Sequence, residues 1–426
     1  MQEEPDKEKK KILKTICSNT NNIIKMCGDK MPIENVKGRC QLGWFKDNFI
    51  ADLLDKDDNI IGVANGLLVL DKKAKFINYS TTYKITRTTN TYYVPYDANN
   101  KYIIKVETIL SEIISNPKKL KGMLMHISLC LVRGKVDRYF NIFFSNGSSG
   151  KTILMQLIEN ALGMISDSTY GANFGYYDTI DASVFNEDKR DVNGVDHHLK
   201  KLEHPRFVQC PEGKGGIIHP HIFKKLRDGC GVRGMQQEVK NISFGGIIAY
   251  VTNHPLRFLN YNYALSRRLL YHYFTSKFVP EPKALNEKKE NIKYKIKSQK
   301  NKNWGAAFLS ILIKHWDMMN EEYNGDISKI YSESGLGQET QDYLDSQNYL
   351  FQFINRCVKL NVEGARITVL EFCKIYAEWY RKILNMRNIT SPETFINEAK
   401  EMLDNYILIE NKIHYFDKVQ IIEENL

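Results

Sequence analysis

No run in this 426-residue chain is long and apolar enough to predict a helix that crosses a bilayer. The first six residues also lack the apolar core of a secretory signal. The eight cysteines include no Cys-x-x-Cys pair, and Cys130 and Cys373 sit in apolar runs, as reduced thiols of intracellular proteins do. We therefore expect an intracellular protein without a membrane partner, in the cytoplasm or the nucleus.

Metal-binding patterns are missing as well. The sequence places four potential zinc ligands near one another, but their spacing matches no zinc-binding pattern: His197, His198, His204 and Cys210. What the chain has instead is positive charge, with 60 Lys and Arg against 50 Asp and Glu and a formal net charge of +10. Such a balance suits a polyanionic partner such as nucleic acid but does not by itself establish one. The length allows two or three domains.

A glycine- and serine-rich stretch lies between a predicted strand and a predicted helix. The apolar run Tyr139–Phe144 suits a buried strand, and apolar residues at helical spacing run from Ile153 to the stop at Gly163. Strand, small-residue loop, Lys-Thr and helix is the order that cradles phosphate with backbone N–H groups and a helix N-terminus. The predicted nucleotide-binding residues are Ser145, Asn146, Gly147, Ser148, Ser149, Gly150, Lys151 and Thr152.

Two residues of this stretch have predicted roles in the chemistry. Lys151 would reach the β- and γ-phosphates of ATP, and the Thr152 hydroxyl would ligate Mg²⁺. Ser145 stands where the usual pattern has glycine, so the first turn lacks a residue that adopts positive φ freely. The alternative is a plain turn before a helix with a surface lysine, and the flanking strand and helix favour the nucleotide site.

Three later stretches complete a predicted ATPase site. A strand that ends at Glu212 supplies a carboxylate for the Mg²⁺ shell or the attacking water, and a second strand ends at Asn253, whose amide can orient that water. Arg267 and Arg268 precede another strand, and either guanidinium could act on its own nucleotide or on that of a neighbouring subunit. We predict Lys151, Glu212, Asn253 and the arginine pair as catalytic, with Thr152 and Glu212 at the metal.

These stretches resemble the superfamily 3 helicases, and most closely the poxvirus-type primase-helicase ATPases of large DNA viruses. The matching motifs are Gly150-Lys151-Thr152, Cys210-Pro211-Glu212, Lys224-Lys225-Leu226, Thr252-Asn253 and Ala264-Leu265-Ser266-Arg267-Arg268. Upstream, Ile61-Gly62-Val63-Ala64-Asn65-Gly66 resembles the Asn-Gly signature of the domain that precedes the ATPase. The resemblance runs from about residue 45 to the end, and it departs at Ser145 and at Glu212, which has no acidic neighbour.

The resemblance implies an α/β fold with an AAA+-like P-loop ATPase core between two smaller parts. The expected divisions are an N-terminal mixed or helical domain over 1–125, the core over 126–280, a linker and helical segment over 281–345, and a winged-helix-like domain over 346–426. We expect core strands at Tyr139–Phe144, Arg206–Cys210, Gly246–Val251 and Leu269–Phe274. A helical tract over 106–133 precedes them, and the Lys-dense stretch over 283–302 reads as a solvated tether or as an arm that faces DNA.

The last eighty residues predict two helices and a hairpin. Thr368 and Glu371 form a capping box, Ser391-Pro392 starts the second helix, and Asn411-Lys412 joins two short strands. This order suits a winged helix that docks on nucleic acid, or equally a small α+β bundle.

The family resemblance implies a ring, with six subunits, that moves along DNA with ATP and Mg²⁺ during viral replication. In a ring, one arginine of the pair would reach the ATP of the next subunit. The basic residues expected to face DNA in the central pore are Lys224, Lys225, Arg227, Arg233 and Lys240. The equal alternative is a solvated basic helix face. Larger relatives carry a primase domain for which this chain has no room, so we expect a helicase that works with a separate primase or polymerase, or a piece of a longer protein.

Two other functions fit the same residues. The ring could package or load DNA without separating strands, or the chain could bind DNA in a nucleotide-dependent way without hydrolysis. The latter is favoured if Ser145 and the isolated Glu212 disable hydrolysis. A P-loop kinase fits less well, because no lid for an acceptor substrate is apparent.

Overall fold

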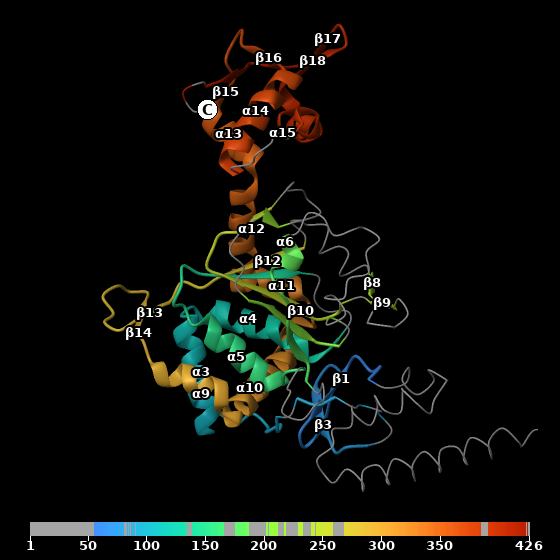
Figure 1. Ribbon diagram of the computed structural model, residues 1–426, viewed down its shortest axis with the longest axis vertical. Coiled ribbons are helices and arrows are strands. Elements are labelled where there is room, and N and C mark those ends of the chain that lie inside the picture. Colours follow the sequence, from blue (N-terminus) through green and yellow to red (C-terminus); the bar gives the residue numbers. More distant parts are fainter. Residues whose placement is uncertain are drawn as a thin grey trace, which may run out of the picture. The chain divides into compact units, whose positions relative to one another are not determined.

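The computed structural model describes residues 55–80, 83, 85, 87–89, 91–133, 139–165, 175–186, 202, 204–211, 217–218, 229–232, 240–242, 244–258, 268–384, 391–422 and 424. The chain divides into two compact units, Met1–Thr340 and Gln341–Leu426, whose elements are labelled in Figure 1. In the described part of the chain, no helix combines the length and the apolar character that crossing a bilayer requires.

The first described elements form a three-stranded antiparallel sheet. Its strands are β1 (Ile60–Val63), β2 (Gly66–Leu70) and β3 (Ala74–Ile77), in that order. β1 and β2 form a hairpin in which Val63 pairs with Gly66, so Ala64 and Asn65 make the turn and Gly66 already belongs to β2. The inner side chains of β1 and β2 are buried and join the main core of the unit.

A five-stranded parallel sheet forms the centre of the first unit. Its order is β12-β4-β10-β6-β5, and all four pairings are parallel. The strands are β4 (Phe140–Phe144), β5 (Tyr177–Thr179), β6 (Phe207–Cys210), β10 (Ile247–Thr252) and β12 (Leu269–Tyr273). The four predicted core strands are confirmed to within one residue at each end, and β5 was not predicted. The strands are apolar and mostly buried, as strands covered on both faces are.

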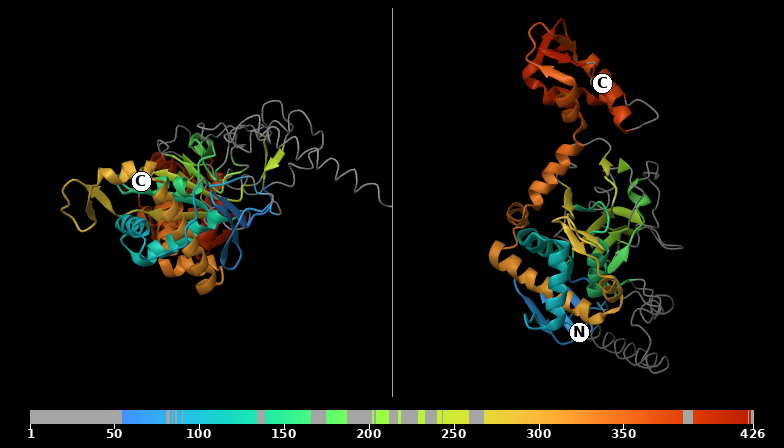
Figure 2. Two further views of the ribbon diagram at one scale, coloured as in Figure 1. Left: turned by 90° about the horizontal axis from the view of Figure 1, so that it is seen from below. Right: turned by 90° about the vertical axis from the view of Figure 1, so that its left-hand side faces the viewer.

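Helices cover both faces of this sheet. On one side the core joins Phe143 of β4 to apolar residues of α3 (Lys101–Ile113), α4 (Pro117–Ser128), α5 (Lys151–Leu162) and α10 (Lys302–Tyr323), and Figures 1 and 2 show these helices together. On the other side Phe185 of α6 (Ser183–Asn186) packs on Phe140 and Tyr250. The remaining elements of the unit are η3 (Leu129–Leu131), β7 (Ile217–Ile218), β8 (Cys230–Val232), β9 (Lys240–Ile242), β11 (Arg257–Phe258), β13 (Lys277–Val279), β14 (Glu287–Lys289), α9 (Ile292–Lys300), α11 (Ile327–Ser334) and α12 (Leu336–Gln347), which runs into the second unit.

One expectation about this unit is confirmed in outline and another was wrong. The predicted helical tract over 106–133 is present as α3, α4 and η3, but it starts at Lys101 and is broken at 114–116, because the Asn116 side chain caps a new helix whose first residue is Pro117. The Lys-dense stretch is not a solvated tether, because α9 packs on α5 and the buried Ser298 hydroxyl donates to Oε1 of Gln156 at 2.5 Å.

The second unit is a small α+β body with its own core. Its elements are α13 (Tyr349–Cys357), β15 (Val358–Leu360), β16 (Arg366–Thr368), α14 (Val369–Leu384), η5 (Pro392–Phe395), α15 (Ile396–Met402), η6 (Asp404–Tyr406), β17 (Ile407–Glu410), β18 (Ile413–Asp417) and β19 (Val419–Ile421). The predicted capping box is confirmed, since the Thr368 hydroxyl accepts the Glu371 N–H at 3.1 Å. The hairpin is also confirmed: Asn411 and Lys412 both have positive φ, as a tight two-residue turn requires.

Candidate nucleotide site

The predicted phosphate loop connects β4 to α5 and bends with three residues in the left-handed region. Gly147, Ser148 and Gly150 have φ values of 101°, 48° and 85°. A Cβ on Gly150 would lie 2.6 Å from Cγ1 of Ile113, whereas nothing lies within 4 Å of that position at Gly147. The loop is therefore packed against the protein at Gly150 and open beside Gly147. Ser145 is not among the residues with positive φ, so replacing the usual glycine does not strain the turn.

The Ser145 hydroxyl is the centre of the loop's hydrogen bonds. It accepts the Gly147 N–H at 3.2 Å and the Ser149 hydroxyl at 2.9 Å, and it also accepts Nζ of Lys151. Ser145 and Lys151 are buried, with 1% and 6% of their surfaces exposed. A loop of small residues that folds inward in this way places an ammonium group beside the first turn of α5.

The structure brings Asn253 to the same place. Because β10 lies beside β4 and Thr252 pairs with Phe144, the two strands end at one level. The Asn253 Oδ1 atom accepts Nζ of Lys151 at 2.7 Å and the Ser145 hydroxyl at 3.3 Å. Ser145, Lys151 and Asn253 thus form one hydrogen-bonded group at the carboxyl ends of two parallel strands, where ligands bind in open α/β sheets.

Neighbouring groups support the loop. The Asn146 amide donates to the Tyr273 hydroxyl at 3.4 Å, and the Phe278 N–H donates to the Ser148 carbonyl at 2.7 Å. The Thr152 side chain is exposed in the first turn of α5, whose free N–H groups and dipole favour an anion. The loop is therefore held from the β12 side and from β13.

Arg268 lies at the amino ends of the parallel strands, opposite to the ends that carry the loop. Its carbonyl accepts the Phe140 N–H at 2.7 Å, at the amino ends of β4 and β12. The Arg268 backbone is therefore about 13 Å, one strand length, from the loop that follows Phe144. Arg267 lies outside the described residues. This placement separates Arg268 from Lys151 within one chain.

Several predicted site residues cannot be placed. Glu212 and four of the five basic residues lie outside the described part: Lys224, Lys225, Arg227 and Arg233. Lys240 belongs to β9, and its side chain is not described.

Two carboxylates that the sequence analysis missed lie on the β5 side. Asp178 is the middle residue of β5 and accepts the Thr179 N–H at 2.7 Å, and Asp181 lies two residues beyond the end of β5. Burial, and to a lesser extent Asp181, raise the pKa of the Cys210 thiol at the end of β6, so this thiol stays protonated. The acidic pair lies within and just after a strand of three residues, which is too short to give a periodic signal.

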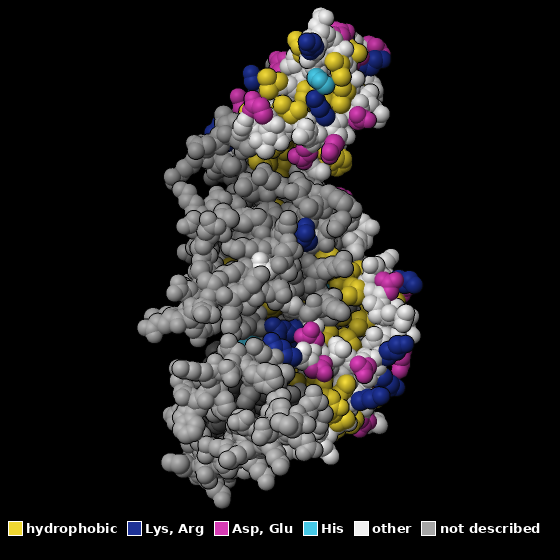
Figure 3. Space-filling model, turned by 90° about the vertical axis from the view of Figure 1, so that its right-hand side faces the viewer, with side chains coloured by type: hydrophobic (Ala, Val, Ile, Leu, Met, Phe, Trp, Pro, Cys, Tyr) yellow, Lys and Arg dark blue, Asp and Glu magenta, His cyan; other side chains and the backbone are white. Residues whose placement is uncertain are grey.

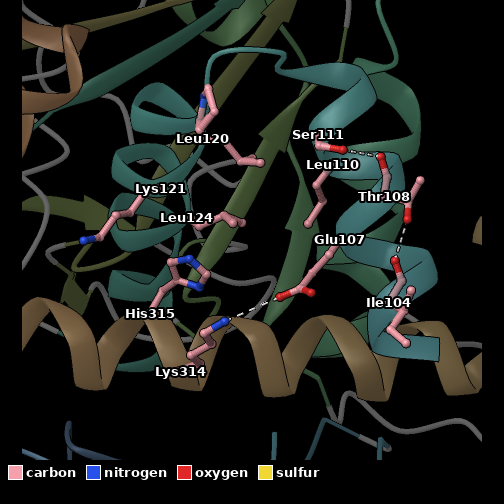
Figure 4. Close-up of a pocket in the computed structure, with 11 residues that line it drawn as sticks. Ile104, Glu107, Thr108, Leu110, Ser111, Leu120, Lys121, Leu124, Lys314 and His315 are labelled. Atoms are coloured by element: carbon pink, nitrogen blue, oxygen red, sulfur yellow. Dashed lines mark hydrogen bonds and ion pairs between the residues drawn. The ribbon is translucent and has the colours of Figure 1, made fainter. Parts of the chain in front are cut away.

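A separate pocket of about 450 Å³ opens between α3, α4 and α10 (Figure 4). None of the predicted site residues lines it. Glu107 already accepts the Tyr96 hydroxyl at 2.8 Å and lies 3.6 Å from Nζ of Lys314. Burial lowers the pKa of His315, which also lines the pocket, to about 4. The pocket is thus distinct from the loop, and its charged groups are partnered.

Comparison with known proteins gives one clear relative. The chain is 25% identical over 374 residues to the protein named "Putative primase C962R" in four isolates of African swine fever virus. The match covers 85% of this chain and 37% of that protein, so the chain spans little more than a third of the length of these relatives. No protein-family model matches.

Two solved structures show weaker likeness. The C-terminal region of NrS-1 is 10% identical, with a TM-score of 0.38 over 84% of this chain and 95% of that one. A JCV helicase is 14% identical, with a TM-score of 0.31 over 55% and 65% of the two chains. TM-scores this low do not establish a common fold.

Proposed function

We propose that this chain is an ATP-dependent DNA helicase or translocase of superfamily 3 that acts in viral DNA replication as a ring, with six subunits. One observation carries the proposal: the Lys151 ammonium lies between Ser145 and Asn253 at the start of α5. A buried cation at a helix N-terminus, behind a loop with left-handed residues, suits the β- and γ-phosphates of a nucleotide. Similarity to a viral protein named as a primase supports a role in replication.

The residues present fit ATP and Mg²⁺. The open side of Gly147 leaves room at the loop, and the exposed Thr152 hydroxyl is available as a metal ligand. Glu212 is the proposed carboxylate at the metal and the attacking water, and Asn253 the proposed amide that orients this water. In this proposal the first unit contains an AAA+-like core, and the helices and hairpin of the second unit form a winged helix.

Arg267 and Arg268 are proposed to act on the ATP of the next subunit. Support comes from the position of Arg268 at the amino ends of the strands, away from its own loop. Lys224, Lys225, Arg227, Arg233 and Lys240 are proposed to contact DNA phosphates, with a separate primase or polymerase as the working partner.

ATP hydrolysis with and without single-stranded DNA, together with strand displacement on a forked duplex, tests this function. A helicase hydrolyses ATP faster with DNA and separates the fork, and Glu212→Gln keeps ATP binding while losing turnover. Hydrolysis without displacement would favour packaging or loading. Binding without hydrolysis would favour nucleotide-dependent DNA binding as the function. The Ser145 hydroxyl gives a reason for this outcome, because it accepts hydrogen bonds from the Gly147 N–H and from Lys151, which would otherwise be donated to a phosphate. Absence of ATP binding would overturn the proposal.

A further inference from the structure

Aromatic side chains gather around the β1–β2 turn and are unusually open to solvent. Phe76 is 40% exposed, Tyr79 56% and Tyr92 65%. These three residues come from β3 and from the extended segments that follow it. Rings of this size are normally covered, so exposure of several together marks a surface that binds something.

The Asn65-Gly66 signature holds these rings in place. A Cβ on Gly66 would lie 2.7 Å from the Phe76 ring, so only glycine lets that ring lie across β2. The Asn65 side chain pairs with the Tyr93 backbone in both directions, each at 2.9 Å, and the Tyr93 ring lies 5.4 Å from that of Phe76. The Tyr79 hydroxyl donates to the Val63 carbonyl. The Phe76 and Tyr79 rings are thus held in place although they remain exposed, and Tyr92 directly precedes the anchored Tyr93.

The charge of the same segment suits a polyanion. Residues 71–94 contain five Lys or Arg and one acidic residue, interleaved with five aromatic residues, and one of the five basic residues, Arg87, is buried. Lys72 and Lys75 are exposed, and Lys73 makes a surface ion pair with Glu321 at 3.4 Å. On the face shown in Figure 3, hydrophobic, Lys or Arg, and Asp or Glu side chains all lie beside one another in the lower part.

We propose that Phe76, Tyr79 and Tyr92, held by the Asn65-Gly66 turn, form a stacking platform for the bases of single-stranded nucleic acid. Exposed aromatic rings stack on bases of any sequence, and nearby lysines neutralise the backbone. The positive balance of the segment favours nucleic acid over a second copy of the chain as the occupant. The inference rests on the proposed function for its partner but uses none of the residues at the nucleotide site.

The test measures binding of a fluorescent oligo-dT by anisotropy. Phe76→Ala combined with Tyr92→Ala should weaken binding at least tenfold, since each stacked base contributes about 1–3 kcal/mol. Phe351→Ala, which truncates a ring that is 45% exposed in the second unit, is the matched control and should change nothing. Lys72→Ala and Lys75→Ala should each lower the salt slope by about one unit, while the ring variant keeps the wild-type slope.

A second variant protects the test from misfolding. Tyr92→Trp retains a ring, so it should bind like wild type, and its fluorescence should be quenched by the oligonucleotide. ATP hydrolysis without DNA should stay at the wild-type rate in every variant. If the wild type binds the oligonucleotide and the variant with Phe76→Ala and Tyr92→Ala binds it equally well, the platform is overturned and the proposed function still stands. Loss of assembly with unchanged DNA affinity would overturn it in favour of an interface between copies, and failure of the wild type to bind DNA would overturn both proposals.

Discussion

The predicted phosphate loop and the β1–β2 turn both contain glycine and polar residues, but the glycines have different physical roles in the two places. In the loop, Gly147 and Gly150 have positive φ, and the polar side chains turn inward on Ser145. In the turn, Gly66 is not among the residues with positive φ, and the space it leaves is filled by an aromatic ring. The loop presents a buried ammonium, whereas the turn presents exposed rings.

The difference shows that a glycine in a motif has either of two physical roles. It supplies a backbone conformation that other residues adopt at a cost, or it removes a Cβ where another group must pass. The first role builds a cradle of backbone N–H groups that suits phosphate. The second allows close packing and suits a scaffold. Variants at the two places should therefore affect different partners.

The largest effect on ATP hydrolysis should come from variants of the arginine pair. These variants test whether the site needs groups from a neighbouring subunit in addition to those of its own loop. Arg267→Ala combined with Arg268→Ala should lower the rate of ATP hydrolysis by about 10³–10⁵. Mixing this protein with Lys151→Ala should restore part of the activity, because some mixed interfaces pair an intact loop with intact arginines. Absence of rescue in demonstrably mixed rings would place the arginines in their own subunit's site or in the fold.

The two loop glycines should differ in stability. Gly150→Ala combines positive φ with a Cβ at 2.6 Å from Ile113, so we expect it to lower the free energy of unfolding by about 4 kcal/mol. Gly147→Ala adds a Cβ in open space and should cost only about 1 kcal/mol. Urea unfolding of both variants measures the contrast, and equal losses would refute it.

Acid should weaken the strands that carry the loop before it weakens the β1–β2 sheet. Burial, then His126 and Lys119, hold the pKa of His272 well below its usual value, and His272 stacks on Phe143 of β4. The unfolded chain binds a proton there below about pH 6.5 and the folded chain does not, so stability falls as the pH drops below that value.

His315, with its pKa lowered to about 4, follows the same trend. Its effect lowers the free energy of unfolding by about 3 kcal/mol as the pH falls from 6.5 to 4. Hydrogen exchange of β4 and β12 measured against pH should show the trend, and His272→Gln should flatten it. A pH profile unaffected by that substitution would contradict the account of His272.

The smallest effect concerns the serine in place of glycine. Ser145→Ala removes the hydroxyl that accepts the Gly147 N–H and Lys151, which frees these donors for phosphate. ATP affinity, measured by calorimetry, should rise about three- to tenfold, the value of one net hydrogen bond. Ser145→Gly should behave alike, since the turn needs no positive φ at that position. Weaker binding by both variants would show that Ser145 itself helps to hold the nucleotide.

The sequence predicted much of the core because long buried strands leave clear apolar runs. The β4, β6, β10 and β12 boundaries follow from such runs, and the meeting of Lys151 with Asn253 follows from parallel strands ending at one edge. The position of Arg268 could also have been read from the sequence, since a residue just before a parallel strand lies at the amino edge.

Other features depend on packing that composition does not reveal. Strand β5 has only three residues, and apolar spacing continues through the break before Pro117. The lysines of α9 suggested a solvated segment, although its Ser298 and Tyr294 contact other helices. The inward hydrogen bonds of Ser145 arise from side-chain geometry in the folded loop, which no spacing rule describes.

The most direct test of the central claim is ATP hydrolysis by Lys151→Ala, with Lys359→Ala as a control that removes an exposed lysine of the second unit. The account predicts a loss of about 10²–10³ in kcat for Lys151→Ala, unchanged thermal unfolding of the fold and a wild-type rate for Lys359→Ala. A folded Lys151→Ala protein that hydrolyses ATP at the wild-type rate would show that the Ser145–Gly150 loop is not the nucleotide site.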